Sequence, residues 1–304
     1  MFHVCSSNPF REKGFWFKGN LHTHTTNSDG ALSPEQTIRL YKKNGYDFLS
    51  ITDHEVVTGI KQLSEVFKDG FLLIPGAELA VGRSETQTRY HIVALNLEHM
   101  IETGDDPQTA IDNVKNEGGE ALVAHPSWSA LTTHDILKLK GYLGIEIFNS
   151  TCHFAVSKGY STIHWDGLLN RNIAAYGFAV DDAHYHFNEH RPVDACYAWI
   201  HLKAPKLTLE SVMESIRKGL FYSSNGPEIF DVNVTEESVT VKSSPAKAIS
   251  FITKNGLGQR FTAMNKPMTE AKYLLRGNER YLRIEVEDGN GGTAWTNAIV
   301  FNRE

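Results

Sequence analysis

The chain is poor in cysteine, has no surplus of positive charge and contains no long hydrophobic run. Its three cysteines (Cys5, Cys152 and Cys196) form neither a Cys-x-x-Cys pair nor an even-numbered disulfide framework, so a reducing compartment is expected. No segment approaches the roughly 18 consecutive apolar residues of a membrane-spanning helix, and residues 1–20 lack the apolar core of a signal peptide. We therefore expect a cytoplasmic protein without membrane contact.

The charge balance and the missing loop motifs exclude further classes of protein. Lys and Arg number 30 against 36 Asp and Glu, and a net charge of -6 argues against extended nucleic-acid binding. The sequence also lacks a Gly-x-Gly-x-x-Gly turn, a Walker-type lysine loop and a Gly-x-Ser-x-Gly elbow. With 41% hydrophobic and 11% aromatic residues, the chain is nevertheless globular rather than disordered.

Histidine is abundant and unevenly placed. All 14 histidines lie between His3 and His201, and the last third of the chain has none. At a rough prior of about 150 residues per domain, the 304 residues fit one large and one small domain. We predict a first domain over residues 1–225 and a small β domain over residues 226–304.

The local patterns differ between the two parts. Before residue 225, strand-like runs at 14–21, 48–52, 71–74, 90–97, 120–124, 144–148 and 174–180 are interspersed with helical patterns at 33–44, 106–117, 133–140, 161–170 and 207–218. Repeated strand–helix units predict a parallel sheet or barrel. Beyond residue 226, short strands separated by Gly- and Asn-containing turns predict an antiparallel sheet or small sandwich.

Imidazole and carboxylate groups follow five of the predicted strands, where parallel sheets and barrels place their sites. His22 and His24 are two residues apart, so they project from the same face of an extended chain, and Asp182 and His184 have the same spacing. Nitrogen and oxygen donors without thiolate suit Zn, Mn or Fe in a catalytic site. Any one of these histidines could also be a satisfied polar residue at a strand end.

The motifs at these strand ends are Leu21-His22-Thr23-His24-Thr25, Ser28-Asp29-Gly30, Ile51-Thr52-Asp53-His54, Pro75-Gly76-Ala77-Glu78 and Asp182-Ala183-His184. Taken together, they resemble the PHP (polymerase and histidinol phosphatase) family of metal-dependent phosphoesterases, over roughly residues 14–225. The order of the domains further resembles the two-domain CehA/McbA-like branch.

The resemblance implies a distorted (β/α)7 barrel of PHP type that holds two or three divalent metal ions. Its ligand sets would be His22, His24, Glu78 and Asp182 for the first ion; Glu78, His91 and His125 for the second; and Asp29, His54 and His184 for the third. Asp181 departs from the small residue expected before Asp182.

This site predicts hydrolysis of a small phosphate ester. Two ions sharing Glu78 could lower the pKa of a bridging water to give hydroxide near neutral pH. The catalytic candidates are Asp53, Glu78 and Asp182. Of these, Asp53 is the one expected to orient an imidazole or to shuttle a proton. The substrate-binding candidates are Arg83, Arg89, His153, His186 and Arg191. Trp128 is expected to pack against a helix rather than to line the cleft.

Two other functions remain open. The same metal site could hydrolyse a carboxylic ester, carbamate or amide, as the CehA/McbA-like resemblance implies. The chain could instead be a non-catalytic binding module, although the nearly complete ligand set argues against a lost activity. The small β domain could shield the first domain or support a homo-oligomer.

Overall fold

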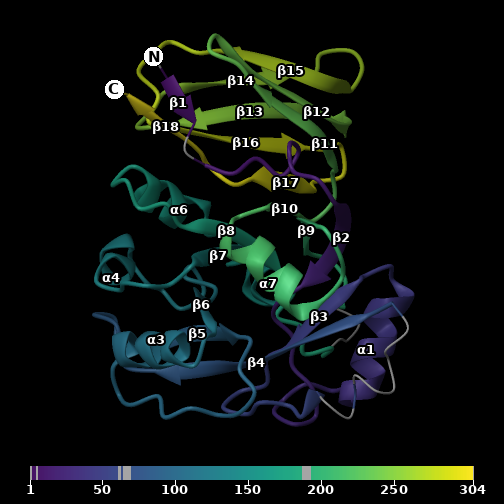
Figure 1. Cartoon of the computed structure of the whole chain (residues 1–304), viewed down its shortest axis with the longest axis vertical. Helices are drawn as coiled ribbons and strands as arrows, with labels where there is room; N and C mark the ends of the chain where they lie inside the picture. The colour runs from purple at the N-terminus through teal and green to yellow at the C-terminus, as the bar shows by residue number, and fades with distance from the viewer. Residues whose placement is uncertain (1, 5, 61–62, 64–69, 187–192, 304) are drawn as a thin grey trace.

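The computed structural model describes residues 2–4, 6–60, 63, 70–186 and 193–303. A mixed α/β part and a β-rich part are stacked along the long axis of the molecule (Figure 1). In the α/β part the strands are β2 (Phe15–Asn20), β3 (Phe48–Ile51), β4 (Leu72–Val81), β5 (Tyr90–Leu95), β6 (Glu120–Val123), β7 (Gly144–Asn149) and β8 (Tyr176–Val180).

These seven strands are hydrogen-bonded in sequence order, but they are not all parallel. The pairs β2–β3, β3–β4, β6–β7 and β7–β8 are parallel, whereas β5 runs antiparallel to both β4 and β6. Pairing with β5 also extends β4 beyond the predicted run of 71–74. Glu78 therefore lies within a strand and not after its end, which corrects the expected position.

Backbone contacts join the first and last strands of this series at the ends that carry the motifs. The N–H of Asp182 donates to the carbonyl of His22 at 2.9 Å, and the N–H of His24 donates to the carbonyl of Ala183 at 2.9 Å. Within the described residues these contacts and one isolated bridge, between Thr23 and Ala183, connect the two ends without a full β8–β2 ladder. The structure thus shows a mixed α/β fold, and the closed seven-fold barrel stays a prediction.

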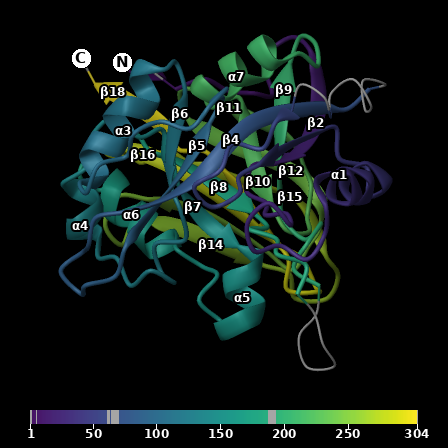
Figure 2. The same cartoon turned by 90° about the horizontal axis from the view of Figure 1, so that it is seen from below.

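The helices lie around the outside of these strands (Figure 2). The predicted helical patterns become α1 (Pro34–Lys43), α3 (Pro107–Asn116), α4 (Thr133–Leu137), α6 (Thr162–Leu169) and α7 (Leu209–Arg217). Helix α1 begins at a capping box of Ser33 and Gln36, because each side chain accepts a hydrogen bond from the other residue's backbone N–H. Helix α5 (Ser150–Val156) was not predicted from the sequence, and it follows directly on β7.

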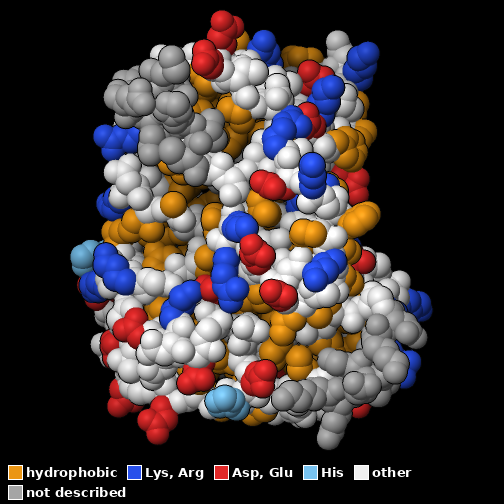
Figure 3. Space-filling model, viewed as in Figure 1, with side chains coloured by type: hydrophobic (Ala, Val, Ile, Leu, Met, Phe, Trp, Pro, Cys, Tyr) orange, Lys and Arg blue, Asp and Glu red, His pale blue; other side chains and the backbone are white. Residues whose placement is uncertain are grey.

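Apolar side chains from both faces of the sheet form the core. One buried cluster includes Ile92, Ile111, Val123 and Trp165, where strands meet helices α3 and α6, and a second combines strand side chains with the buried face of α7. No helix among the described residues is long and apolar enough to cross a membrane. On the face shown in Figure 3, acidic and basic side chains are interspersed, so this face carries no single-sign patch of the kind that binds nucleic acid.

Strands β9 (Trp199–Ala204) and β10 (Phe221–Ser224) connect the two parts, because the sheet continues from β2 through β9 and β10 into β17. The remaining strands are β11 (Ile229–Val234), β12 (Ser238–Ala246), β13 (Ala248–Thr253), β14 (Gly258–Thr262), β15 (Met268–Leu274), β16 (Tyr281–Glu287), β17 (Thr293–Thr296) and β18 (Ile299–Arg303). β11, β12 and β15 form a separate three-stranded antiparallel sheet over a shared apolar core. The small C-terminal antiparallel β region is therefore present.

The first strand, β1 (Phe2–Val4), pairs with β18 and so lies with the C-terminal β region rather than with the α/β part. This long-range pairing has no local signal in the sequence. The boundary between residues 225 and 226 remains a prediction. Strand β1 belongs in space to the β-rich part after this boundary, although it comes first in the sequence.

Candidate metal centre

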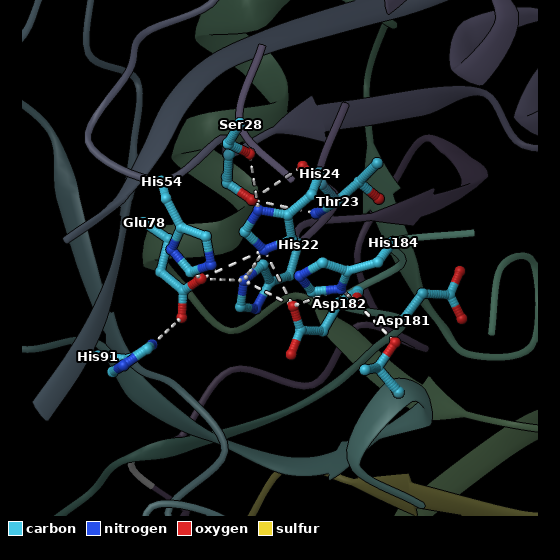
Figure 4. A network of polar contacts seen from close by, with 12 residues as sticks. His22, Thr23, His24, Ser28, His54, Glu78, His91, Asp181, Asp182 and His184 are labelled. Atoms are coloured by element: carbon cyan, nitrogen blue, oxygen red, sulfur yellow. Dashed lines mark hydrogen bonds and ion pairs between the residues drawn. The ribbon is translucent and has the colours of Figure 1, made fainter. Parts of the chain in front are cut away.

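Imidazole and carboxylate side chains from most strands of the α/β part meet in one cluster (Figure 4). His22 and His24 follow β2, His54 follows β3, His125 follows β6, and Asp182 and His184 follow β8, while Glu78 and His91 lie within β4 and β5. In the β4–β5 register, Glu78 faces Val93 and Ala80 faces His91. Residues two apart share a face, so Glu78 and His91 are diagonal neighbours on the same side of the sheet.

The tightest group contains His22, His24, Glu78 and Asp182, all of them buried. The Nε2 atoms of His22 and His24 are 3.1 Å apart, and each lies 3.2 Å from Oε2 of Glu78. Oδ1 of Asp182 lies 3.2 and 3.0 Å from the same two nitrogens. Ligand atoms arranged tetrahedrally at about 2.0 Å from zinc are about 3.3 Å apart, so these four residues fit a first coordination sphere.

Glu78 extends the cluster in a second direction through its other oxygen. Its Oε1 lies 2.8 Å from Nδ1 of His91 and 3.0 Å from Nε2 of His125. His54 lies between the groups, because its Nδ1 is 3.2 Å from Oε2 of Glu78. The carboxylate therefore presents one oxygen to each of two donor groups, which is the arrangement of a bridging ligand.

A third group is looser and more open to solvent. Oδ1 of Asp29 lies 3.4 Å from Nε2 of His184, and its Oδ2 lies 3.6 Å from Nε2 of His54. The Asp29 side chain is 55% exposed. Nδ1 of His24 also approaches Asp29, at 3.6 Å, although its Nε2 belongs to the first group. The structure thus brings all nine expected ligand residues together.

Contacts on the side away from the cluster orient three of the imidazoles. Nδ1 of His22 lies 2.6 Å from Oε1 of Glu146, Nδ1 of His125 lies 3.0 Å from Oγ of Ser129, and Nδ1 of His184 lies 2.8 Å from the carbonyl of Asp182. Each outer nitrogen can donate to its partner, which leaves the Nε2 lone pair facing the cluster. Histidines that bind metals are held in this way.

The electrostatics of the cluster are those of a site for cations. Burial opposes protonation of the imidazoles, but hydrogen bonds and charges of Asp182 and Glu78 raise the pKa of His24 to about 9 and that of His22 well above its usual value. Conversely, the surrounding imidazoles hold the pKa of Glu78 and of Asp182 well below the usual range despite burial. Without metal ions, the carboxylates are balanced by protons on the imidazoles. Metal ions would displace these protons on binding.

Two cluster residues have a positive φ angle, which residues other than glycine rarely adopt. The φ angle is 25° at His125 and 53° at Asp182. Strain of this kind is found at functional sites, where the surrounding structure maintains it. Gly30 is required for close approach, because a Cβ there would lie 2.6 Å from the carbonyl carbon and oxygen of His24.

Two further carboxylates near the motifs, those of Asp53 and Asp181, have hydrogen-bond partners outside the donor groups. Asp53 is buried and accepts hydrogen bonds from the backbone and hydroxyl of Thr25, from Ser28 and from Thr58, so it orients the turn after β2 rather than an imidazole. Asp181 points away from the cluster and accepts from Tyr41 and from the backbone N–H groups of residues 196–198. Burial raises the pKa of Asp181 to about 7.

The substrate-binding candidates are dispersed. Arg83 donates to the carbonyl of Gln87 and Arg89 to that of Ala80, so both guanidinium groups bind the β4–β5 segment itself, and neither lines the cleft. His153 packs against the rings of Phe148, Phe154 and Tyr160 instead of the cleft. Of the five candidates, His186 does line the cleft, and Arg191 lies outside the described residues.

The cleft over the cluster has a volume of about 310 Å³. Beyond the donor groups and His186, it is lined by Trp128, Thr151, Cys152 and Ala155. The expectation that Trp128 packs against a helix was wrong, because the residue lines the cleft, is 41% exposed and contacts the rings of His91 and His125 edge-on. The other three residues belong to α5, which had no recognisable sequence pattern.

Comparisons with known proteins point to one family. Residues 20–106, which contain six of the nine candidate ligands, match the PHP domain. The chain is 28% identical over 169 residues to an uncharacterized protein of Methanocaldococcus jannaschii, covering 52% of this chain and 88% of that protein. It is 35% identical over 85 residues to a 5'-3' exoribonuclease of Haemophilus influenzae, covering 27% of this chain and only 29% of that enzyme.

A solved structure shares the arrangement in two parts. It is a two-domain protein of Bacteroides vulgatus, described as containing a predicted PHP-like metal-dependent phosphoesterase. The two align with a TM-score of 0.51 at 18% identity, covering 94% of this chain and 95% of that one, which shows a common fold. The PHP domain match over residues 20–106 thus agrees with the family that the motifs predicted, and the two-domain structure shares the fold of the chain.

Proposed function

We propose that the chain is a metal-dependent phosphoesterase that hydrolyses a small phosphate ester at this cluster. The observation that carries the proposal is the position of Glu78, whose two carboxylate oxygens each face a separate group of imidazoles. A carboxylate that joins two donor groups is suited to a pair of ions that share a substrate.

The distances support the ligand sets that the motifs imply. The first ion would be held by His22, His24, Glu78 and Asp182; the second by Glu78, His91 and His125; and the third by Asp29, His54 and His184, with His54 also within reach of Glu78 and His91. Nitrogen and oxygen donors without thiolate favour Zn, Mn or Fe. The exposed Asp29 makes the third set the weakest of the three.

When bound, the ions would supply Lewis acidity and an activated water. The protein contributes geometry. The hydrogen bonds of His22, His125 and His184 fix their donor nitrogens, and the Asp53 carboxylate holds the turn that carries His24 and Asp29. The cleft walls of Trp128 and α5 limit the substrate to a small ester.

The test is reconstitution followed by a substrate panel. Metal-free protein is loaded with Mn, Fe or Zn, the bound metal is measured, and turnover is compared on aryl phosphates and nucleoside monophosphates. At least one equivalent of metal and metal-dependent release of phosphate are expected. Less than one equivalent per chain, or no phosphate release with any of the three metals, contradicts the proposal.

Variants locate the activity. His22→Ala and Asp182→Asn should abolish turnover while far-UV circular dichroism shows a preserved fold, because each removes one donor from the most buried group. His99→Ala is the matched control, since this histidine side chain is 72% exposed and pairs only weakly with Glu117, at 3.8 Å. Full activity in both cluster variants would show that the site lies elsewhere.

A second candidate activity is hydrolysis of a carboxylic ester, carbamate or amide. It is favoured by the cleft lining, where the described residues include no Lys or Arg to pair with a phosphate dianion. Aryl carboxylic esters and aryl carbamates, assayed beside the aryl phosphates, distinguish the two. Turnover of the carboxylic substrates alone rejects the phosphoesterase proposal.

We also propose that strands β2–β8 form the distorted barrel of the PHP type and that the domain boundary lies near residue 225. Three exoribonuclease relatives match only part of their own length, so an RNA substrate does not follow for this chain. A short 5'-phosphorylated oligonucleotide belongs in the panel, and we expect it to be a poorer substrate than a mononucleotide.

A further inference from the structure

Glu146 is a buried carboxylate directly behind the cluster that the PHP motifs do not include. It lies in β7, and its side chain is fully buried. A buried carboxylate is strongly unfavourable unless its oxygens are hydrogen-bonded. The hydrogen-bond partners of the Glu146 carboxylate are two candidate ligands, His22 and His125, and Asn149.

Three donors share its two oxygens. Oε1 lies 2.6 Å from Nδ1 of His22. Oε2 accepts from the backbone N–H of His125 at 2.7 Å and from Nδ2 of Asn149 at 2.9 Å. The same Nδ2 donates to Oδ2 of Asp182 at 3.0 Å. One carboxylate and one amide thus contact ligands of both the first and the second ion.

The orientation of the Asn149 amide is determined by a separate bond. Its Oδ1 accepts from the backbone N–H of Cys152 at 2.9 Å, which caps the start of α5. Because the oxygen is used there, the two N–H donors must face the carboxylates of Glu146 and Asp182. The network has therefore one consistent assignment of donors and acceptors.

We propose that Glu146 and Asn149 are positioning residues that fix the metal-binding tautomer of His22 and the backbone of His125. Because Oε1 of Glu146 accepts from Nδ1 of His22, that nitrogen carries the proton and the Nε2 lone pair faces His24, Glu78 and Asp182. The bond to the N–H of His125 also stabilises the unusual φ angle of 25° at this residue. This inference rests on the proposed function in assuming that the cluster binds metal ions.

An isosteric substitution separates this role from simple packing. In Glu146→Gln, the amide oxygen can keep the bonds from His125 and Asn149, which places the amide NH₂ against Nδ1 of His22. Two donors cannot share a hydrogen bond, so the imidazole proton moves to Nε2 and blocks the metal-binding lone pair. Loss of an orienting partner of this kind weakens metal affinity by about 10–100-fold.

The readout is Mn²⁺ affinity, measured by titration calorimetry on metal-free protein, and it does not depend on turnover. Glu120→Gln is the matched control, because Glu120 is also a buried glutamate of the same sheet but pairs with Lys115 and Arg217. We expect Glu146→Gln to bind Mn²⁺ about 10–100-fold more weakly and Glu120→Gln to stay within about twofold of the wild type. Equal affinity in wild type and Glu146→Gln overturns the proposal.

A double variant tests whether Glu146 acts through His22. In the His22→Ala background, Glu146→Gln should change Mn²⁺ affinity by less than about twofold, because the imidazole it orients is absent. A loss as large as in the wild-type background would indicate a general structural role and overturn the inference. Wild-type protein that binds no Mn²⁺, Fe²⁺ or Zn²⁺ instead refutes the proposed function, so the two failures are distinguishable.

A spectroscopic measurement covers the case in which Glu146→Gln does not fold. Long-range ¹H–¹⁵N correlation spectra of the Zn-loaded wild type report the tautomer of each histidine, and the His22→Ala spectrum assigns the signal. We expect His22 to carry its proton on Nδ1. A proton on Nε2 contradicts the proposed role without any change at Glu146.

Discussion

Arg283 provides the sharpest test of how the two parts of the molecule are held together. This arginine of β16 is only 2% exposed, and its Nε and Nη2 atoms each lie 2.7 Å from one oxygen of Asp166 in α6. Its Nη1 lies 2.6 Å from Glu285, and the guanidinium carbon lies 5.0 Å from the ring centroid of Trp165. We predict that Arg283→Met destabilises the fold strongly.

The magnitude follows from what the substitution leaves behind. Removing one partner of a buried ion pair costs about 3–5 kcal/mol, because the other charge remains without compensation. The Asp166 side chain is 31% exposed, so water compensates part of this loss and the lower end of the range, about 3 kcal/mol, is expected. At an unfolding entropy of about 2.1 cal/mol/K per residue, 304 residues that unfold together would show a decrease in Tm of roughly 5 °C.

The assay is urea denaturation of metal-free protein, followed by far-UV circular dichroism. Arg260→Met is the control, because Arg260 makes a similar two-pronged contact with Glu287 but is 48% exposed. Surface pairs contribute about 0–1 kcal/mol, so this variant should stay close to the wild type. Adding Asp166→Asn to Arg283→Met should restore part of the stability, since it removes the unpaired carboxylate.

The reasoning is refuted if Arg283→Met loses no more stability than Arg260→Met. That outcome would mean that the guanidinium contributes no more at the junction of α6 and β16 than at the surface. Failure of Asp166→Asn to restore stability would show that lost packing against Trp165, rather than the unpaired charge, causes the destabilisation.

Three further predictions concern pH, the cleft and the turn after β2. Burial lowers the pKa of His201 to about 4. Below about pH 6.5 the imidazole is therefore protonated in the unfolded chain but still neutral in the folded one. The free energy of unfolding then decreases by at most about 1.4 kcal/mol per pH unit as the pH falls. Urea denaturation at pH 7 and pH 5 should therefore show a smaller pH effect in His201→Gln than in the wild type, and equal effects would exclude this role. Trp128→Ala should raise KM for aryl esters about 2–10-fold at nearly unchanged kcat, because it removes an aromatic wall, and unchanged steady-state kinetics would count against that contact. Gly30→Ala should destabilise the fold by about 1–3 kcal/mol in the same denaturation assay, because its Cβ would lie 2.6 Å from the His24 backbone, whereas Gly256→Ala, with nothing within 4 Å, is the control that should change little.

Much of the candidate site could be predicted from the sequence because its motifs are local. The pairs His22 and His24, and Asp182 and His184, share a face of extended chain at any register, so their cooperation follows from spacing alone. The helical pattern at 33–44 likewise became α1 (Pro34–Lys43), because its N-cap Ser33 and first-turn Pro34 are adjacent in sequence. These features depend on backbone geometry within a few residues.

The roles of the arginines and of Asp53 could not be predicted in the same way. Arg83 and Arg89 flank the segment between two candidate ligands, but only the β4–β5 pairing shows that both bind backbone carbonyls beside the cleft and do not line it. Asp53 is adjacent to His54 in sequence, yet the donors that surround its carboxylate come from residues 25, 28 and 58. Neighbours along the chain are not the partners in space.

The sequence by itself therefore determined the candidate metal-donor set, the PHP motifs and the division between a histidine-rich α/β part and a β-rich part. Only the tertiary structure decided that β5 is antiparallel, that β1 pairs with β18, and that Glu146 and Asn149 contact the candidate ligands His22 and Asp182. The physical reason is that donor chemistry and alternation are properties of a few consecutive residues. Register and contacts between distant strands depend instead on how the whole chain buries its apolar surface, which no short segment specifies.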